Sequence, residues 1–217
     1  MHIGVIGLGN FGTALVRRLY DLGHQVTALD IKSKALAPVQ DYADQAVSAD
    51  ATDRSVLEEL GLGLADAAVV SLGDNMAASI LVTLHLKEME LKRIISKAIG
   101  PEHEKILKRV GASEVIFPER DAAERLATSL VHPNLLDFLP LGGEFSVAEV
   151  APISEWVGKT LVDVSLRSKY NVNVIAIREL VPERMTVLIK PDYKIKDSDV
   201  LVVLGRQEDI QQLPTVK

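Results

Sequence analysis

The stretch IGLGNFG, at residues 6–12, contains the pattern Gly-x-Gly-x-x-Gly between an apolar run and a helical one. In such a strand–loop–helix unit the first glycine allows a tight turn, the second lets a phosphate approach the backbone, and the third lets the helix pack on the strand. The amides at the start of the helix then face the phosphate. A second β-rich run ends at Asp30, 18 residues after Gly12, where a carboxylate can accept hydrogen bonds from both hydroxyls of a ribose. Together these features predict a nucleotide site.

The carboxylate of Asp30 also limits which nucleotide fits. It would repel a 2′-phosphate, so NADP is disfavoured, whereas ATP, ADP, AMP and NAD remain open. The expected ligand is therefore an adenine nucleotide without a 2′-phosphate.

Residues 1–117 alternate short β-rich runs with helical stretches, which is typical of a parallel sheet covered by helices on both faces. The expected strands are His2–Ile6, Gln25–Leu29, Gln45–Val47, Ala67–Leu72, Arg93–Lys97 and Glu114–Phe117. We therefore expect an α/β fold with a doubly wound parallel sheet of order 3-2-1-4-5-6.

In that strand order the ligand crevice opens at the carboxyl ends of the first and fourth strands. The other strand ends at this edge are Asp50-Ala51-Thr52, Leu72-Gly73-Asp74 and Lys97-Ala98. Each candidate also has a plainer interpretation: Asp50 or Thr52 could cap the next helix, and Lys97 could be a surface lysine. Glu119 could simply favour the dipole of a helix start, whereas His103, at another helix start, could touch the ligand.

After the residues expected to form the parallel sheet, the sequence no longer alternates strands and helices regularly. Pro118 opens a helix to about Val131, and residues 132–143 hold two prolines and a Gly-Gly pair, which mark a change of unit. We expect residues 1–133 to form the nucleotide-binding domain, 134–143 a linker, and 144–217 a small α+β domain. The elements expected in that domain are strands at 145–150, 172–177, 186–189 and 200–204, a helix at 160–170 and a final helix from Gln207.

Composition excludes several classes of protein. With 24 basic and 30 acidic residues the chain carries a net charge of −6, the wrong sign for binding nucleic acid through its phosphates. It has no cysteine, which removes disulfides and thiolate metal sites. No apolar run reaches the length of about 18 residues that spans a bilayer, so any membrane role is expected to be peripheral.

The side chains that a nucleotide-dependent enzyme needs are not evident. No tyrosine is followed four residues later by lysine, the five histidines lack metal-ligand spacing, and there is no Walker lysine or Gly-x-Ser-x-Gly elbow. A dehydrogenase needs an acid or base beside the nicotinamide. We therefore expect binding without turnover, with a small NAD-dependent oxidoreductase as the alternative.

Several further runs accompany the glycine loop, in a fixed order over nearly the whole chain. They are Asp30-Ile31, Asp50-Ala51-Thr52, GASEVIFPE at 111–119, VGKTL at 157–161, RSKY at 167–170 and NVIAI at 173–177. Together they resemble the cytoplasmic regulatory subunits of Trk/Ktr potassium uptake systems. The resemblance implies a Rossmann-type RCK N-terminal domain, an RCK C-terminal domain, and a homodimer that assembles into a homo-octameric ring. It also implies a potassium-translocating membrane partner, which would hold the ring at the inner face of the cell membrane, with no direct membrane insertion.

The resemblance assigns ligands to individual positions. In the family ATP favours the conducting state and ADP the closed one, and some members bind NAD(H). The implied nucleotide contacts are Gly7, Gly9, Asn10, Phe11, Gly12, Asp30, Ile31, Lys32, Asp50, Ala51, Thr52, Leu72, Gly73, Asp74, Lys97, Ala98 and His103. Glu119 would help to hold a divalent cation, Mg²⁺ or Ca²⁺, near the γ-phosphates at a dimer interface. Arg167, Asn173 and Val174 match positions that contact cyclic di-AMP in some relatives.

One position departs from the family pattern. Relatives that respond to ATP often have arginine in place of Asn10, where it meets a γ-phosphate across the dimer. Asparagine is shorter and uncharged, so it lacks that charge-assisted contact. The choice between ATP, ADP, AMP and NAD(H) therefore stays open, with Lys97 as another basic group, and a stand-alone sensor without a membrane partner is a third hypothesis.

Overall fold

The computed structural model describes residues 1–73 and 75–214, and the chain divides into two compact units, Met1–Glu119 and Arg120–Lys217. The division falls within helix α5 (Pro118–Val131), which begins at the proline expected to open a helix. Each unit has its own sheet and its own hydrophobic core.

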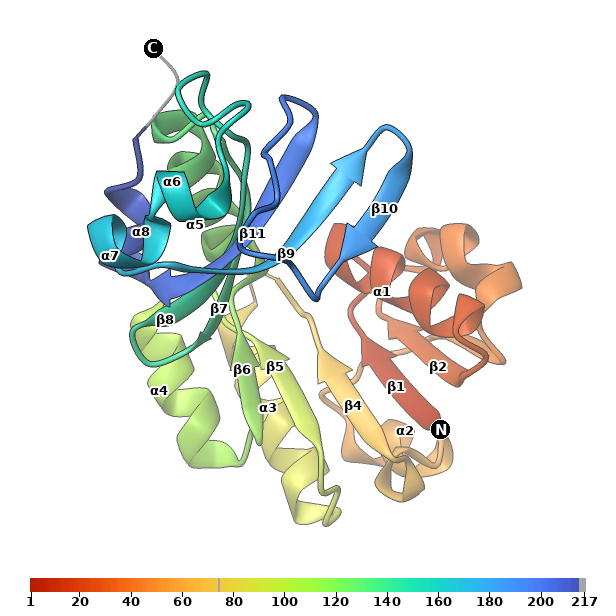
Figure 1. Ribbon diagram of the computed structural model, residues 1–217. Helices are drawn as coiled ribbons and strands as arrows, with labels where there is room; N and C mark the ends of the chain where they lie inside the picture. Colours follow the sequence, from red (N-terminus) through yellow and green to blue (C-terminus); the bar gives the residue numbers. More distant parts are fainter. Residues whose placement is uncertain (74, 215–217) are drawn as a thin grey trace. The chain divides into compact units, whose positions relative to one another are not determined.

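The first unit is built on a six-stranded parallel sheet of order β3-β2-β1-β4-β5-β6 (Figure 1). Its strands are β1 (His2–Ile6), β2 (Gln25–Asp30), β3 (Gln45–Ser48), β4 (Ala67–Val70), β5 (Ile94–Lys97) and β6 (Glu114–Ile116). Its helices are α1 (Asn10–Asp21), α2 (Arg54–Glu59), α3 (Met76–Glu88) and α4 (Pro101–Val110), with 3-10 turns η1 (Ser33–Ala35), η2 (Ala37–Tyr42) and η3 (Leu62–Leu64). The strand order confirms the doubly wound sheet.

This sheet is buried on both faces because successive residues of a strand point to opposite sides. Val5 of β1 packs in a cluster with Val16 of α1 on one face. Ile6 packs with Leu57 of α2 and Val82 of α3 on the other. Burial on both faces explains why these strands read as short apolar runs in the sequence rather than as alternating ones.

The glycine loop joins β1 to α1 through backbone contacts that leave no room for two side chains. Gly7 has a φ of +94°, and a Cβ there would overlap the backbone of Ser71. A Cβ on Gly12 would overlap the carbonyl oxygen of Gly7. At Gly9, in contrast, no described atom other than those of Gly9 and its chain neighbours lies within 4 Å of a Cβ position. Two glycines are therefore needed for packing, and the one between them borders open space.

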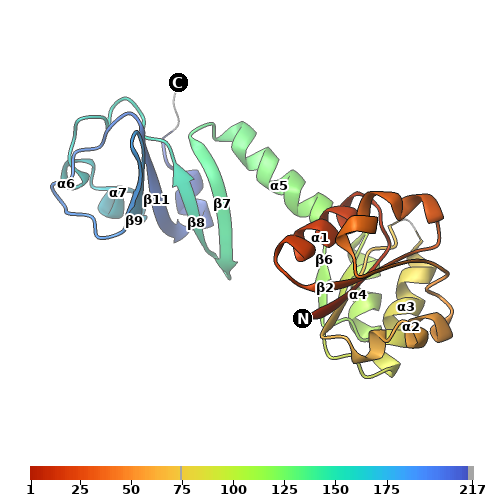
Figure 2. The same cartoon turned by 90° about the vertical axis from the view of Figure 1, so that its right-hand side faces the viewer.

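The second unit contains a five-stranded antiparallel sheet of order β10-β9-β11-β8-β7 (Figure 1), of which Figure 2 labels β9, β11, β8 and β7. Its strands are β7 (Leu135–Gly142), β8 (Phe145–Val150), β9 (Asn173–Leu180), β10 (Glu183–Thr186) and β11 (Asp199–Arg206). Its helices are α6 (Leu161–Val164), α7 (Leu166–Tyr170) and α8 (Gln207–Gln211). This arrangement agrees with the small α+β domain expected from the sequence.

Three local expectations for this unit differ from the structure. Strand β7 occupies most of the expected linker at 134–143; it lies at the sheet edge, where a strand tolerates proline. The strand expected at 186–189 is displaced to β10, because pairing with β9 sets its position. The helix expected over 160–170 is interrupted at Ser165, whose φ of +54° separates α6 from α7. The domain limits themselves stay a prediction.

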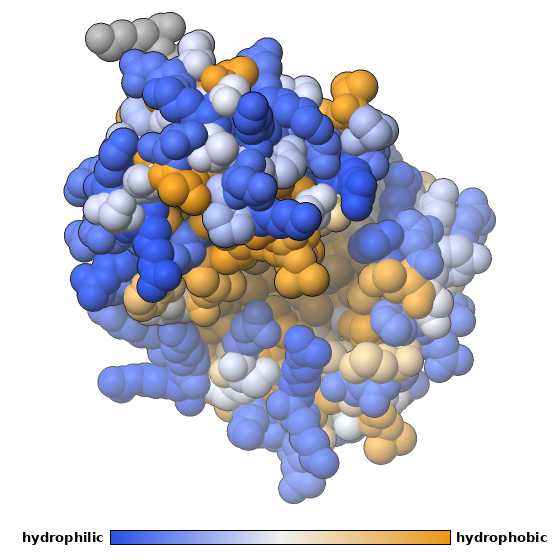
Figure 3. Space-filling model, viewed as in Figure 1, coloured by the Kyte–Doolittle hydropathy of each residue, from blue (hydrophilic) through white to orange (hydrophobic). Residues whose placement is uncertain are grey.

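Hydrophilic side chains cover most of the surface seen in Figure 3. Among the residues that the structure describes, no helix combines the length and apolar content needed to cross a membrane.

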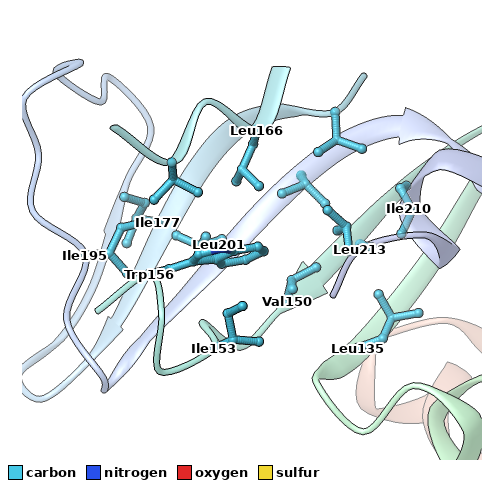
Figure 4. Close-up of a cluster of buried hydrophobic side chains, with 14 residues drawn as sticks. Leu135, Val150, Ile153, Trp156, Leu166, Ile177, Ile195, Leu201, Ile210 and Leu213 are labelled. Carbon is cyan, nitrogen blue, oxygen red and sulfur yellow. The ribbon is translucent and has the colours of Figure 1, made fainter. Parts of the chain in front are cut away.

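The core of the second unit gathers around Trp156, which is buried (Figure 4). Trp156 lies among Ile177 of β9, Leu201 of β11 and Ile195, which precedes β11. Leu166 of α7 belongs to the same cluster, so the short helices pack on one face of the antiparallel sheet. The second unit therefore has a hydrophobic core of its own, separate from the clusters of the first unit.

The glycine contacts give a stability prediction. Gly12→Ala should lower the free energy of unfolding by about 3 kcal/mol, because the new methyl group meets a backbone carbonyl that cannot move aside. The matched change Gly9→Ala meets open space and should cost less than about 1 kcal/mol, the scale of a changed N-cap residue. Urea unfolding followed by circular dichroism measures both, and equal losses would contradict the packing role of Gly12.

Candidate functional site

A cavity of about 680 Å³ opens at the carboxyl ends of the central strands of the first unit. Its lining residues are Ile6, Gly7, Leu8, Gly9, Leu29, Asp30, Ile31, Lys32, Ala35, Ala49, Asp50, Ala51, Thr52, Ser71, Leu72, Gly73, Asn75 and Ala78. They lie at or just after the ends of β1, β2, β3 and β4, in η1, or at the start of α3. From β1 the sheet is extended by β2 and β3 on one side and by β4, β5 and β6 on the other. The connections therefore lead away from each other, and space stays open between the carboxyl ends of β1 and β4. The cavity thus lies where the strand order predicts a ligand crevice.

Many of the residues predicted to bind a nucleotide meet in this cavity. They are Gly7, Gly9, Asp30, Ile31, Lys32, Asp50, Ala51, Thr52, Leu72 and Gly73. These residues come from four strand ends that are far apart in the sequence, and the parallel sheet brings them to one edge. Asp74 lies outside the described residues.

Both carboxylate oxygens of Asp30 are held by the backbone around the cavity. Oδ2 accepts a hydrogen bond from the amide of Leu8 at 2.7 Å, and Oδ1 accepts one from the amide of Lys32 at 2.8 Å. An ionised carboxylate has about four acceptor positions, so two remain for the hydroxyls of a ligand. Asp30 therefore ties the glycine loop to β2 and keeps two acceptor positions for a ligand in the cavity.

Helix α1 starts at the wall of the cavity without a side-chain cap. Its N-cap residue is Gly9, and within the described part of the chain no side-chain hydrogen bond caps the helix. These amides and the positive end of the helix dipole favour an anion. Because Gly9 also borders open space, the start of α1 is accessible to an anion beside Asp30.

Asp50 holds the loop after β3 in a turn. Its Oδ1 accepts hydrogen bonds from the amide of Thr52 at 2.9 Å and from the Thr52 hydroxyl at 2.7 Å, and these two bonds lower the pKa of Asp50. The cap of α2 is Asp53 instead, whose side chain accepts from the amide of Ser55. The interpretation of Asp50 or Thr52 as the helix cap is therefore wrong, and both residues line the cavity.

Three residues of the wall where β4 leads into α3 were not predicted from the sequence, although their neighbours Leu72 and Gly73 were. Ser71, Asn75 and Ala78 line the cavity there. Asn75 caps α3 by accepting a hydrogen bond from the amide of Ala78 at 3.0 Å. An asparagine just before a helical run is a recognised start signal, so this residue was open to prediction. The other missed lining residues, apolar and without a chemical signal, are Ile6, Leu8, Leu29, Ala35 and Ala49.

Other predicted contacts lie outside the walls of this cavity. Asn10 faces a neighbouring groove along α1, Phe11 is half-buried, and Gly12 is buried against the loop. Ala98 is also buried, in a small cluster with Leu107 of α4. Their direct contact with a nucleotide stays a prediction.

His103 is enclosed by the protein. It is 1% exposed, and its Nδ1 accepts a long hydrogen bond of 3.4 Å from the amide of Ile99. Its Nε2 has no partner within the described residues. Burial lowers the pKa of His103 below its ordinary value, because the charged ring would lose its hydration. The neutral ring is therefore the favoured form, and its predicted contact with a ligand would require an opening of α4.

Lys97, at the end of β5, forms an ion pair with Glu119 in the first turn of α5. The lysine side chain is 12% exposed and the glutamate side chain 69% exposed. The hydrogen bond from Lys97 lowers the pKa of Glu119. No group of three or more potential metal ligands occurs in the described parts of the chain, so these residues of one copy do not fit a divalent cation by themselves.

Two of the predicted second-ligand residues lie at the start of β9, and the third lies on the preceding helix α7. Arg167 is exposed on α7, and Asn173 is exposed at the start of β9. Val174 is half-buried and packs against the core of the second unit. Two polar side chains thus face solvent beside an apolar one, an arrangement open to a ligand from outside.

The sequence of this chain matches two domain families. Residues 3–118 match the TrkA-N domain and residues 146–214 match the TrkA-C domain. The chain is 40% identical over 213 residues to the Ktr system potassium uptake protein C of Bacillus subtilis, which covers 97% of this chain and 95% of that protein. It is 34% identical over 211 residues to the Ktr system potassium uptake protein A of the same organism, with 97% and 94% covered.

Solved structures with low sequence identity share the fold. A GsuK channel bound to NAD superimposes with a TM-score of 0.64 at 18% identity. The match covers 96% of this chain but only 38% of the channel chain. The Kef C-terminal domain of Shewanella denitrificans in its AMP-bound form gives a TM-score of 0.51 at 20% identity, and the match covers 60% of this chain and 80% of that one.

Both the domain matches and the identity to curated relatives extend over nearly the whole chain. The relatives are regulatory subunits of transport systems and not enzymes, so the oxidoreductase alternative is wrong. The chain belongs to the TrkA family of Ktr and Trk potassium uptake proteins.

Proposed function

We propose that this chain is the gating subunit of a Trk/Ktr-type potassium uptake system and that it binds an adenine nucleotide in the cavity between β1, β2 and β4. The observation that carries the proposal is the combination of Asp30 and the uncapped start of α1 on one cavity wall. The NAD-bound and AMP-bound proteins that share the fold support an adenine nucleotide as the ligand. ATP, ADP and NAD(H) each contain the same adenosine and phosphate groups.

The cavity offers a separate place for each part of such a nucleotide. The free acceptor positions of Asp30 suit the ribose hydroxyls, and the amides after Gly9 suit the first phosphate. Ala51 and Leu72 supply apolar wall for the adenine ring. The described residues that line the cavity include no histidine, tyrosine or cysteine, and the nucleotide would be bound without being consumed.

Gating then requires two shapes of the protein with different affinities for the ligand. A nucleotide shifts such an equilibrium only by its differential affinity, which is typically about 1–3 kcal/mol in allosteric systems. The proposed assembly is a homodimer repeated in an octameric ring, held in the cytoplasm against the potassium-translocating membrane subunit. The ring would transmit the nucleotide-dependent change to that subunit.

Two further ligands belong to the proposal. A divalent cation, Mg²⁺ or Ca²⁺, at Glu119 would need ligands from a second copy or from the nucleotide, because one copy provides a single carboxylate already paired with Lys97. Cyclic di-AMP would bind at Arg167, Asn173 and Val174, where exposed polar side chains flank an apolar one.

Removing the carboxylate at Asp30 tests the nucleotide site. Asp30→Ala should lower the affinities for ATP, ADP, AMP and NAD alike, each by about tenfold. All four ligands contain the ribose whose hydroxyls lose a charged acceptor. Isothermal titration calorimetry on the full chain measures the affinities, and Asp41→Ala, an exposed acidic residue of η2, is the control. A wild-type chain that binds no adenine nucleotide would sink the proposed function.

The residue at Asn10 tests nucleotide discrimination. Asn10→Arg should raise the ratio of ATP to ADP affinity by about tenfold, because it adds a cation beside the start of α1. Asn10→Gln is the matched control, since it lengthens the side chain without adding charge. An unchanged ratio in Asn10→Arg would count against a role of this position in sensing the γ-phosphate.

The second unit gives an independent test. Arg167→Ala should lower the affinity for cyclic di-AMP by about tenfold and leave the affinity for ADP unchanged, because the arginine lies outside the nucleotide cavity. Lys169→Ala on the same short helix is the control. Thermal-shift titrations with each ligand report the affinities, since stabilisation follows ligand concentration over dissociation constant. Equal loss in both variants would contradict a specific role for Arg167.

A further inference from the structure

The wall of the nucleotide cavity that follows β3 is a short turn. Oδ1 of Asp50 accepts hydrogen bonds from the amide and the hydroxyl of Thr52. Both bonds lie within the turn, so they fix its shape but not its distance from the other walls. Ala51, between them, is buried in a cluster with Val82 and Leu86 of α3. The position of this wall therefore depends on how the turn is held against α3.

His85, near the end of α3, supplies a polar link to that turn. Its Nε2 lies 3.2 Å from the carbonyl oxygen of Thr52. A carbonyl oxygen only accepts hydrogen bonds, so Nε2 carries a proton and donates it. Helix α3 begins at the cavity, where its cap Asn75 lines the wall. His85 thus ties the turn after β3 to the helix that forms a neighbouring wall.

The second ring nitrogen of His85 faces a carboxylate. Nδ1 lies 3.9 Å from Oε2 of Glu88, and within the described residues this buried nitrogen has no hydrogen-bond partner. In a neutral ring whose Nε2 carries the proton, Nδ1 presents a lone pair to that carboxylate. In the charged ring Nδ1 also carries a proton, which the carboxylate attracts. The groups at both nitrogens therefore favour the doubly protonated ring.

The nearby charges on α2 add to this preference. Arg54, the first residue of α2, pairs with Glu88 at 3.1 Å and with Glu58 at 2.8 Å. These three residues bring one positive and two negative charges to the end of α3. A proton on His85 would balance them.

Charged and titratable groups on the other elements around α3 and the turn have contacts of their own. In the described residues these contacts join Lys105 to Glu102, Lys108 to Glu104, Lys97 to Glu119, His103 to Ile99, Asp50 to Thr52 and Asp53 to Ser55. Strand β4 is uncharged, Arg109 of α4 is exposed, and Lys87 of α3 packs over Gly111. The charge around His85 is thus set by Glu88, Arg54 and Glu58.

We propose that His85 is a positioning residue of the nucleotide cavity. When protonated, it bridges the carbonyl of Thr52 and the carboxylate of Glu88 and holds the turn after β3 against α3. The inference rests on the proposed nucleotide site and adds a dependence on pH to it. Because the protonated ring stabilises the wall that meets the ligand, nucleotide affinity rises as the pH falls through the range in which histidine gains its charge, about pH 8 to pH 6.

The size of the effect follows from exposure. The side chain of His85 is 17% exposed and that of Glu88 is 47% exposed, so solvent screens their attraction. A pair of this kind changes an equilibrium by about threefold.

The test measures ADP binding to the full chain by calorimetry at pH 8 and pH 6. His85→Gln keeps a donor for Thr52 but cannot gain a proton, so the ratio of wild-type to variant affinity should rise by about threefold at the lower pH. Taking this ratio cancels the titration of the ADP phosphates, which is the same in both measurements. Glu88→Gln removes the charge that the Nδ1 proton would meet and should shift the ratio in the same direction. His24→Gln, the same change in the turn between α1 and β2, is the control and should leave the ratio independent of pH.

A ratio that rises for His85→Gln and Glu88→Gln, but not for His24→Gln, supports the proposal. If the ratio for His85→Gln is the same at both pH values, His85 has at most a structural role and the proposal is overturned, while the nucleotide site stands. A wild-type chain that binds no adenine nucleotide at either pH would contradict the proposed function, and the role of His85 would fail with it.

Discussion

The close contact between Gly12 of α1 and the carbonyl of Gly7 is the constraint on which the cavity at the carboxyl ends of the parallel strands depends. It presses the start of α1 against the turn after β1, so the helix amides open onto the gap between β1 and β4. Gly7 is in turn packed against the backbone of Ser71, and Asp30 accepts a hydrogen bond from the amide of Leu8. The loop is thus held by β1, β2 and β4 together, and Gly9 is left facing open space. A side chain at either packed glycine would move the helix start away from the cavity.

Such a loop is rigid where it packs and open where a ligand would bind. The groups that would contact the nucleotide are mostly backbone amides and one carboxylate, all placed before any ligand arrives. Donors that are already in position lose little conformational freedom on binding, so ordering them costs little binding free energy. Family membership as a regulatory subunit is consistent with a site that binds and releases.

The prediction of the fold succeeded where the signal was local. Buried parallel strands read as short apolar runs and helices ended at glycine, so six strands and their order followed from the sequence. It failed where pairing with distant residues decided the outcome. Strand β7 contains a proline and still pairs with β8, because an edge strand needs hydrogen bonds on one side only. Ser165 adopts a left-handed conformation that its residue type does not announce.

The sequence by itself determined the glycine loop, the carboxylate at Asp30, the strand order and the TrkA family, because each depends on residue type at short spacing or on similarity along the whole chain. Only the tertiary structure decided which side chains share a cavity and which charges are already paired. Asn75 and Ser71 join the cavity wall through the pairing of β1 with β4. His103 is enclosed and Lys97 is paired with Glu119, whereas Arg17 and Arg18 line the groove that runs along α1. The reason is physical: burial and charge compensation depend on neighbours in space, and those neighbours are set by packing between segments distant in the sequence.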